Sequence, residues 1–230
     1  MSLILNLETA TAVCSVALAE NGTVIAFRES TEGRRHADQI TLFIQECMEE
    51  SGKTLRDLDA VAVSMGPGSY TGLRIGVATA KGLCYTLGIS LIGINTLEIM
   101  AVGNKNQRTD TTWLCPMIDA RRMEVYCALF DEQLSYQKQT AAEIINADSF
   151  NAFLKTQAIH FFGDGAAKCQ ALLEHQGKAS FDGSFTTSAR YMASLAHSKH
   201  SAPNFKSEDI AYFEPFYLKD FYSPAHSSGA

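Results

Sequence analysis

A glycine-rich segment is the part of the sequence whose residue types and spacing point most directly to chemistry. It reads GPGSYTG at 66–72 and follows an apolar run at 60–65. Backbone N–H groups at a turn between a strand and a helix can bind an anion such as phosphate, because the positive end of the helix dipole lies there. The segment lacks the GxxxxGK[ST] spacing of a P-loop and the G-x-S-x-G frame of a nucleophile elbow. A plain tight turn explains it as well, so both interpretations stay open.

Histidine and cysteine provide no catalytic or metal-binding pattern. The histidines at 36, 160, 175, 197, 200 and 226 form no HExxH or similar ligand set, and no two cysteines form a CxxC pair. Each cysteine lies in an apolar or helical stretch, so we expect small buried side chains in a reducing compartment rather than disulfides. We therefore expect no catalytic residue of these types, no metal site and no cofactor.

The elements that position the glycine-rich turn are predicted from hydrophobic periodicity. Three strands, 3–7, 12–19 and 23–27, form an antiparallel meander with a turn at Asn21-Gly22. Residues 36–50 have the i, i+3, i+4, i+7 pattern of an amphipathic helix. Strand 60–65 is apolar throughout, which is typical of a central strand. Ser69 or Thr71 then caps a helix that reaches about Leu87, followed by strand 90–94 and helix 96–103.

The same pattern restarts after the polar stretch 104–112. Strands 113–118, 124–130 and 135–139 are followed by helix 149–154, strand 159–162 and helix 166–175, and an internal duplication is the simplest explanation. We expect two lobes, residues 1–105 and 106–230. The second lobe also holds a helix at about 188–198, an extended aromatic segment at 212–217 and a flexible tail from about 224.

Composition is that of an ordinary globular protein. The chain has 230 residues, 46% of them hydrophobic and 19% charged, and a net charge of −6. That charge argues against a broad phosphate-binding surface, so any contact with nucleic acid is expected to be local or indirect. The first residues contain neither a basic region nor a long apolar stretch, so we expect no signal peptide, no membrane span and a cytoplasmic location.

The order of elements resembles the duplicated lobes of the actin-like and sugar-kinase-like ATPases. The resemblance implies an α/β actin-like (ASKHA) duplicated fold, two lobes each with a three-strand meander plus βα units. Those ATPases carry Asp-x-Gly-Thr at the end of the first strand, where this chain has ETAT at 8–11, so that Ala10 occupies the glycine position. The GDGA segment at 163–166 resembles their adenosine-side turn. The candidate residual nucleotide contacts are Glu8, Thr9, Gly68, Gly163 and Gly165.

The helix after the glycine-rich turn carries small residues at Gly72, Gly76 and Ala80, spaced four apart. Such a ridge lets another backbone approach closely. Packing on the chain's own sheet is one interpretation, and a helix-to-helix interface with a second protein is the other.

Several segments together resemble the TsaB (YeaZ) family. They are ILNLETATAVCSVAL at 4–18, GPGSYTGLRIGVATAKGLCYTLG at 66–88, INTLE at 94–98 and IDARRMEVY at 118–126. The family commonly has Asp where Glu8 stands. Beyond about residue 175 the likeness is mainly the EPFYL pattern at 214–218.

The catalytic relative of that family, TsaD, binds metal through two histidines of N-H-x-E-G-H. Aligned on Asn95, this chain has Thr96 and Met100 at the histidine positions. The resemblance therefore implies a subunit without transferase activity, and it also argues against the metalloprotease activity once attributed to that relative.

The resemblance further implies partners. They are a TsaD-type catalytic subunit, a TsaE-type P-loop ATPase, tRNA through the complex, and a second copy of this chain when the catalytic subunit is missing. The partner surface is expected on the helices that begin near His36 and Thr71, at residues His36, Ile40, Phe43, Cys47, Leu73, Gly76, Val77, Ala80, Lys81 and Cys84. The alternative is an actin-like nucleotide-binding kinase or ATPase that uses the candidate nucleotide contacts.

Overall fold

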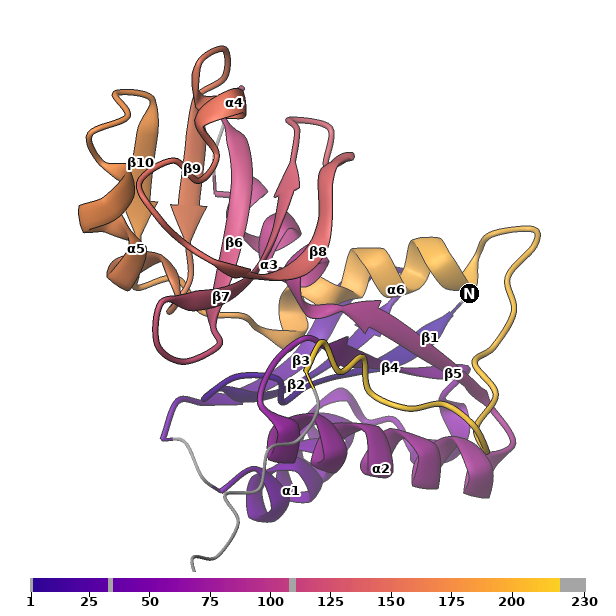
Figure 1. The fold of residues 1–230 in the computed structure, drawn as a ribbon. Helices are drawn as coiled ribbons and strands as arrows, with labels where there is room; N and C mark the ends of the chain where they lie inside the picture. The colour runs from indigo at the N-terminus through magenta and orange to yellow at the C-terminus, as the bar shows by residue number, and fades with distance from the viewer. Residues whose placement is uncertain (1, 33–34, 108–110, 220–230) are drawn as a thin grey trace, which may run out of the picture.

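A computed structural model describes residues 2–32, 35–107 and 111–219. Two lobes, each containing one five-stranded sheet, form the molecule (Figure 1). The tail predicted to be flexible from about residue 224 lies outside the described residues.

The first sheet has the strand order β3-β2-β1-β4-β5. Its strands are β1 (Leu3–Glu8), β2 (Cys14–Glu20), β3 (Thr23–Ser30), β4 (Ala60–Gly66) and β5 (Ser90–Asn95). β1, β2 and β3 pair antiparallel, whereas β4 pairs parallel to β1 and β5 parallel to β4. The predicted meander is confirmed, and so is the central position of β4.

The second sheet repeats this topology. Its order is β10-β9-β6-β7-β8, with β6 (Trp113–Asp119), β7 (Glu124–Phe130), β8 (Tyr136–Ile144), β9 (Ile159–Phe162) and β10 (Ala179–Asp182). Each strand has a counterpart in the first sheet, so the predicted duplicated actin-like α/β fold is confirmed. β10 was not predicted from the sequence, and β8 extends five residues beyond the predicted strand.

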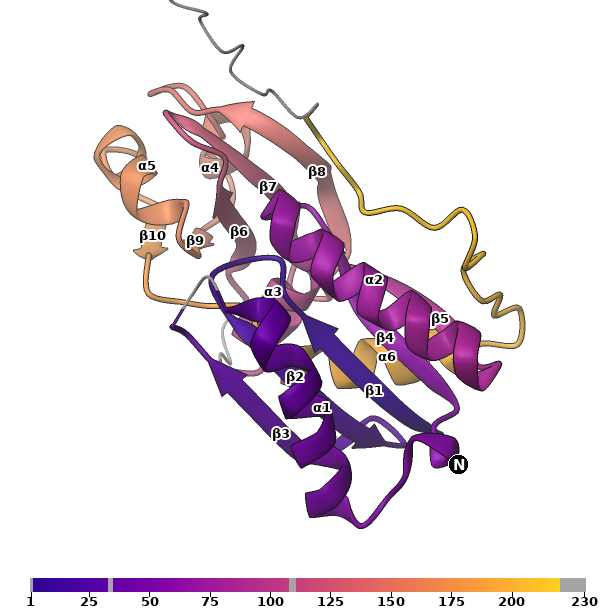
Figure 2. The ribbon, with the colours of Figure 1, turned by 90° about the horizontal axis from the view of Figure 1, so that it is seen from below.

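Two long helices cover one face of the first sheet (Figure 2). They are α1 (His36–Ser51) and α2 (Tyr70–Leu87). Their apolar stripes share one hydrophobic cluster with the inward side chains of β1 and β2, which include Leu5, Leu7 and Val16. A short 3-10 turn, η1 (Leu55–Asp57), lies between α1 and β4.

The helices that follow each sheet pack against the other lobe. α3 (Thr96–Lys105) contributes Leu97 and Met100 to a cluster with Leu114 of the second sheet. η2 (Ala189–Met192) and α6 (Ala193–His200) return to the first sheet, where Met192 and Ala196 share a cluster with strand residues of β1, β4 and β5. The proposed division after residue 105 stays a prediction, and core packing crosses it in both directions.

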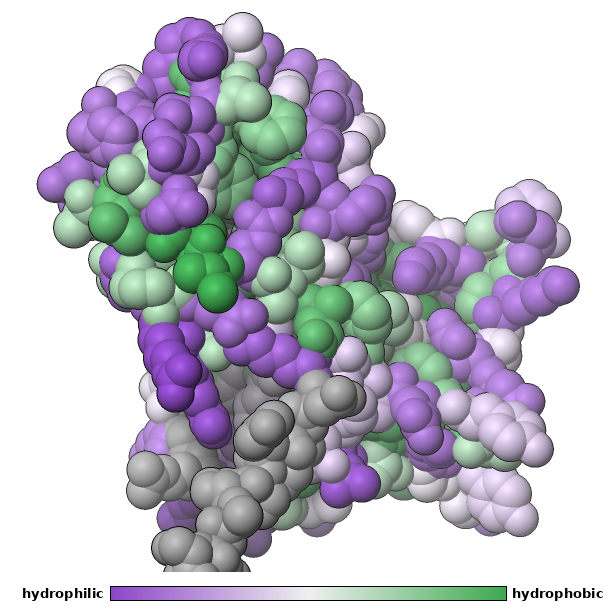
Figure 3. Space-filling model, in the orientation of Figure 1, coloured by the Kyte–Doolittle hydropathy of each residue, from purple (hydrophilic) through white to green (hydrophobic). Residues whose placement is uncertain are grey.

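The remaining helices cover the second sheet. α4 (Asn151–Leu154) and α5 (Ala166–Leu173) contribute Leu154, Cys169 and Leu173 to its core. All six cysteines of the chain are free and buried, as predicted. Figure 3 shows a group of hydrophobic residues at the lower end of the second lobe, close to the first.

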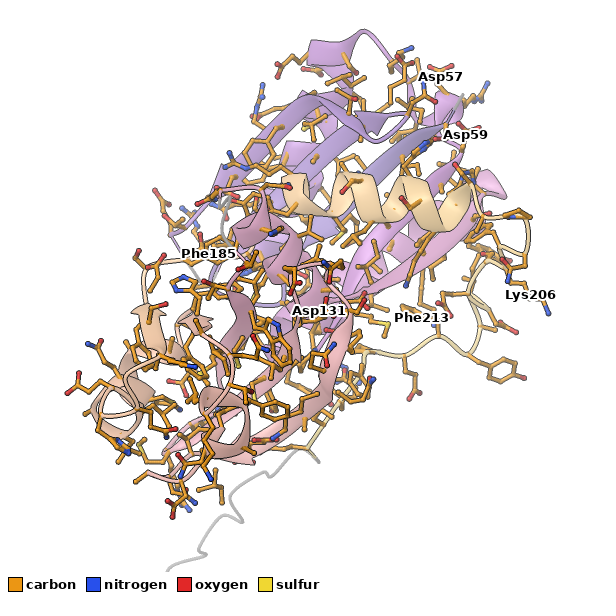
Figure 4. The ribbon with its side chains drawn as sticks, turned by 90° about the horizontal axis from the view of Figure 1, so that it is seen from above. Asp57, Asp59, Asp131, Phe185, Lys206 and Phe213 are labelled. Carbon is orange, nitrogen blue, oxygen red and sulfur yellow. The ribbon has the colours of Figure 1, made fainter. Side chains whose placement is uncertain are left out.

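Residues 205–219 form a C-terminal strap that runs along the edge of the first sheet. Glu208 N donates to Leu91 O at 3.0 Å, and Phe216 N donates to Met65 O at 2.6 Å. Phe213 lies on this strap (Figure 4). Its ring packs over Gly93 of β5, where an added Cβ would lie 2.8 Å from the ring. Among the described residues, no helix is both long and apolar enough to pass through a lipid bilayer.

Candidate functional site

The glycine-rich turn joins β4 to α2 and is closed by the chain's own backbone. Ser69 is the N-cap of α2, and its Oγ accepts a hydrogen bond of 3.3 Å from Gly72 N. Ser69 N donates in turn to Ala10 O at 2.6 Å. Of the two predicted caps, Ser69 is therefore the one used.

Two glycines allow the end of β1 to approach this turn. A Cβ at Gly68 would lie 2.3 Å from Ala10 O, and a Cβ at Gly72 would lie 2.0 Å from Thr9 O. Side chains are therefore excluded at both positions by backbone carbonyl groups. The turn as folded therefore packs against the end of β1, and the Ser69 N–H at the N-terminus of α2 is already bonded to Ala10 O.

Glu8 is fully buried at the end of β1 and accepts hydrogen bonds from three segments. Its Oε1 accepts from Ala10 N at 2.6 Å and from Ser64 Oγ at 2.7 Å, and its Oε2 accepts from Thr187 Oγ1 at 2.9 Å. Desolvation raises the pKa of the Glu8 carboxyl above its ordinary value of 4.5, although these hydrogen bonds oppose that shift. The carboxylate links β1, β4 and the segment before η2.

The second glycine pair belongs to the other lobe. Gly163 has φ +104, and a Cβ there would lie 2.4 Å from Met117 O; Gly165 N donates to Met117 O at 3.1 Å. This turn packs against the end of β6, in the way that the first turn packs against β1. Glu8, Thr9 and Gly68 lie together in the first lobe. A nucleotide contact by these five residues stays a prediction.

The predicted interface residues lie on α1 and α2, and most of them face the sheet. All except Phe43 and Lys81 are buried. His36 Nε2 donates to Thr11 O at 3.0 Å, and a Cβ at Gly76 would lie 2.3 Å from Thr9 Oγ1. Val77 is only 4% exposed in the main core. A direct partner contact by these residues stays a prediction, and a charged residue at Val77 would disturb folding.

The outward face of the same two helices has a different set of residues. An apolar groove of about 370 Å³ lies between α1 and α2. It is lined by Thr41, Ile44, Gln45, Met48, Glu49, Lys53, Leu55, Thr79 and Leu83. Leu42 on α1 is 50% exposed and Tyr85 on α2 is 82% exposed. In the sequence, this face could have been identified from apolar residues that lie outside the buried stripe of each helix, such as Leu42 and Tyr85.

The positions aligned with the metal-binding histidines of TsaD lie on α3. Thr96 and Met100 are both buried, and Asn95 caps the helix by accepting a hydrogen bond from Leu97 N at 2.8 Å. Among the described residues, no group of three or more His, Cys, Asp or Glu side chains is arranged to hold a metal ion.

Comparison with known proteins agrees with this architecture. The family model described as tRNA N6-adenosine threonylcarbamoyltransferase (TsaD) matches residues 29–219. The tRNA threonylcarbamoyladenosine biosynthesis protein TsaB of Escherichia coli K12 is 38% identical over 157 residues, which are 68% of this chain and 64% of that protein. The TsaB protein of Bacillus subtilis 168 is 33% identical over 127 residues, 55% of this chain and 54% of that protein. The matched region spans less than two thirds of the length of either relative.

Solved structures extend the similarity to nearly the whole chain. YeaZ from Pseudomonas aeruginosa superposes with a TM-score of 0.79 at 25% identity, over 95% of this chain and all of that one. A second structure from that organism, described as similar to peptidase YEAZ, has a TM-score of 0.82 at 24% identity. Because the family model covers most of the chain and the named relatives agree with it, the chain belongs to the TsaD-related family and, within it, to the TsaB (YeaZ) group.

Proposed function

We propose that this protein is a non-catalytic subunit in the biosynthesis of threonylcarbamoyladenosine in tRNA, in the cytoplasm. It binds and activates a TsaD-type transferase, and a TsaE-type P-loop ATPase acts in the same complex. The names of the relatives, which are tRNA threonylcarbamoyladenosine biosynthesis proteins, support this role.

The observation that carries the proposal is the outward face of α1 and α2. The groove between the two helices is apolar and open to solvent, and Leu42, which follows the groove-lining Thr41 on α1, is 50% exposed. Clusters of exposed apolar residues mark sites where proteins bind one another. We assign this face to the TsaD-type subunit, or to a second copy of the chain when that subunit is missing.

The closed turn supports the non-catalytic part of the proposal. Carbonyl groups of Thr9 and Ala10 occupy the approach to Gly68 and Gly72, and Glu8 is fully buried by internal hydrogen bonds. An actin-like ATPase needs its acid and its glycine-rich turn open to a magnesium nucleotide. Titration calorimetry with ATP and Mg²⁺ tests this part, since micromolar binding by the isolated chain would favour the kinase alternative.

Mixing experiments test the proposed role directly. The purified chain should modify no tRNA alone and should increase threonylcarbamoyladenosine formation when it is added to the TsaD-type subunit, the ATPase and tRNA. Leu42→Glu should weaken pairing with the TsaD-type subunit at least tenfold, because it places a charge on the apolar face. Pairing is measured by light scattering after size exclusion.

Ile25→Glu provides the matched control. Ile25 is 38% exposed on β3, while its neighbour Ala26 packs against α1 in the main core. Ile25 lies on the edge strand β3, outside α1 and α2 and outside the residues that line the groove. This variant should pair like the wild type. Equal pairing by Leu42→Glu and the wild type would remove the α1 and α2 face from the proposal.

A further inference from the structure

The turn between β6 and β7 contains two consecutive arginines in a strained backbone conformation. Arg121 has φ +72 and Arg122 has φ +50, in the left-handed region that residues other than glycine seldom adopt. Such outliers persist where the surrounding structure enforces them, and they are concentrated at functional sites. We call residues 120–124 the hairpin tip.

Hydrogen bonds to the backbone hold the tip in this conformation. Arg121 N donates to Asp119 Oδ1 at 2.7 Å, and Lys168 Nζ donates to Arg122 O at 2.8 Å. Glu124 N donates to Arg121 O at 3.1 Å. The fold therefore fixes the backbone of both arginines without using either guanidinium group.

The acidic residues of the tip are already paired with lysines. Lys168 Nζ lies 2.6 Å from the Asp119 carboxylate, and Lys219 at the end of the strap pairs with the Glu124 carboxylate. Arg121 and Arg122 are exposed, and neither side chain has an ion pair or hydrogen bond to another described residue. Within the described part of the chain, their two positive charges are therefore presented to solvent without an ion-pair partner.

Aromatic side chains lie on β7 and on the strap that reaches the tip. Lys219 Nζ lies 6.0 Å from the centre of the Tyr126 ring. Two residues earlier in the strap, Tyr217 packs against Tyr70 with ring centres 5.0 Å apart, and Arg74 lies 4.9 Å above the Tyr70 ring. Two residues span at most about 7 Å of backbone, so the strap brings the two groups to neighbouring positions. Positive charges beside aromatic rings are typical of surfaces that bind RNA strands.

We propose that the hairpin tip binds phosphate groups of RNA through Arg121 and Arg122. Guanidinium groups form paired hydrogen bonds with phosphate oxygens, and a fixed backbone reduces the entropy lost on binding. A contact of two arginines is local, in keeping with the net charge of −6. The proposal rests on the proposed function only for the identity of the RNA, a tRNA. Met123 and Ile144 are also exposed near the tip, so a protein partner is the competing occupant.

Salt-dependent binding of a fluorescein-labelled tRNA transcript tests the proposal. It is measured with the full chain alone and in the complex with its TsaD-type subunit. The double variant Arg121→Gln with Arg122→Gln removes two phosphate contacts. The plot of log association constant against log salt concentration should therefore become shallower by about 2. The control Arg56→Gln with Lys206→Gln removes two exposed charges elsewhere and should leave the slope unchanged.

A glycine variant separates RNA binding from a structural role. Arg121→Gly with Arg122→Gly should lower tRNA affinity in the same way while the melting temperature stays equal or rises, because glycine adopts positive φ without strain. An unchanged salt slope in both tip variants overturns the proposal. An equally large change of slope in the Arg56→Gln with Lys206→Gln control also overturns it. Loss of pairing with the TsaD-type subunit while tRNA affinity is kept would assign the tip to a protein contact and would also overturn it. If Leu42→Glu pairs with the TsaD-type subunit as the wild type does, that result contradicts the proposed function and leaves the proposal for the hairpin tip unaffected.

Discussion

The Thr187 hydroxyl donates a 2.9 Å hydrogen bond to the Glu8 carboxylate, across 179 positions of sequence. Thr187 is 1% exposed and Glu8 is fully buried. The bond joins the end of β1 to the segment that leads into η2 and α6, which pack on the opposite face of the first sheet from α1 and α2. Glu8 stands where the actin-like ATPases carry an acidic residue, and here its side chain joins β1, β4 and the segment before η2 by hydrogen bonds.

Burial of Glu8 predicts a pH dependence of stability. Its folded-state pKa lies above the ordinary value of 4.5, so the folded protein holds this proton more tightly than the unfolded chain does. The free energy of unfolding should therefore fall as pH rises from 4.5 toward the folded pKa, by at most about 1.4 kcal/mol per pH unit from this group. Urea unfolding of the wild type and Glu8→Gln across pH 4.5–8 measures the difference. The glutamine variant should lack this slope, and parallel curves for the two proteins would contradict the assignment.

The small residues of α2 predict a position-dependent effect of alanine. Gly72→Ala and Gly76→Ala would place a Cβ 2.0 Å from Thr9 O and 2.3 Å from Thr9 Oγ1, so each should lower the free energy of unfolding by about 1–3 kcal/mol. A Cβ at Gly82, on the same helix, would meet no described atom within 4 Å apart from its chain neighbours and the backbone of its own helix. Gly82→Ala should stabilise the isolated chain by roughly 0.5–1 kcal/mol. Denaturant midpoints test all three variants, and equal effects would rule out the packing account.

The strands and helices could be predicted well because their apolar runs are long and are bounded by turn residues. β7 and β9 have the predicted limits, and α2 ends at the predicted Leu87. β10 was missed because its four residues, ASFD, are too few and too polar for a periodic signal. The duplicated topology would have identified it, since β5 is its counterpart in the first sheet.

The sites were harder to predict than the fold. Periodicity identifies the apolar stripe of a helix, and on α1 and α2 that stripe is used by the chain's own core, as the burial of Ile40 and Cys84 shows. The face that we propose for partner binding is the other side, where the sequence signal is only isolated apolar residues such as Leu42. The bond between Glu8 and Thr187 has no local signature, because a single sequence carries no information about which distant residues meet.

Cysteine reactivity tests the packing of the cores. Burial raises the pKa of Cys14, Cys47, Cys84 and Cys169 to about 11 each. The thiolate is the reactive form, so these groups should react with a thiol reagent at pH 8 far more slowly than in guanidinium chloride, where all six cysteines become accessible. Colorimetric titration counts the modified thiols, and rapid labelling of the native chain would indicate open cores.

Lys81 anchors the strap to α2, which predicts how the strap can be released. Its Nζ donates to Phe213 O at 3.0 Å and to Ala211 O at 3.4 Å. Lys81→Met keeps most of the side-chain stem and removes both bonds, so local opening of the strap should become about tenfold more frequent while global stability changes little. Hydrogen exchange at Glu208 and Phe216, whose amides bond to β5 and β4, reports that opening. Lys206→Met is the control because Lys206 is exposed on the same strap, and unchanged exchange in Lys81→Met would show that Phe213 and the backbone bonds hold the strap without the lysine.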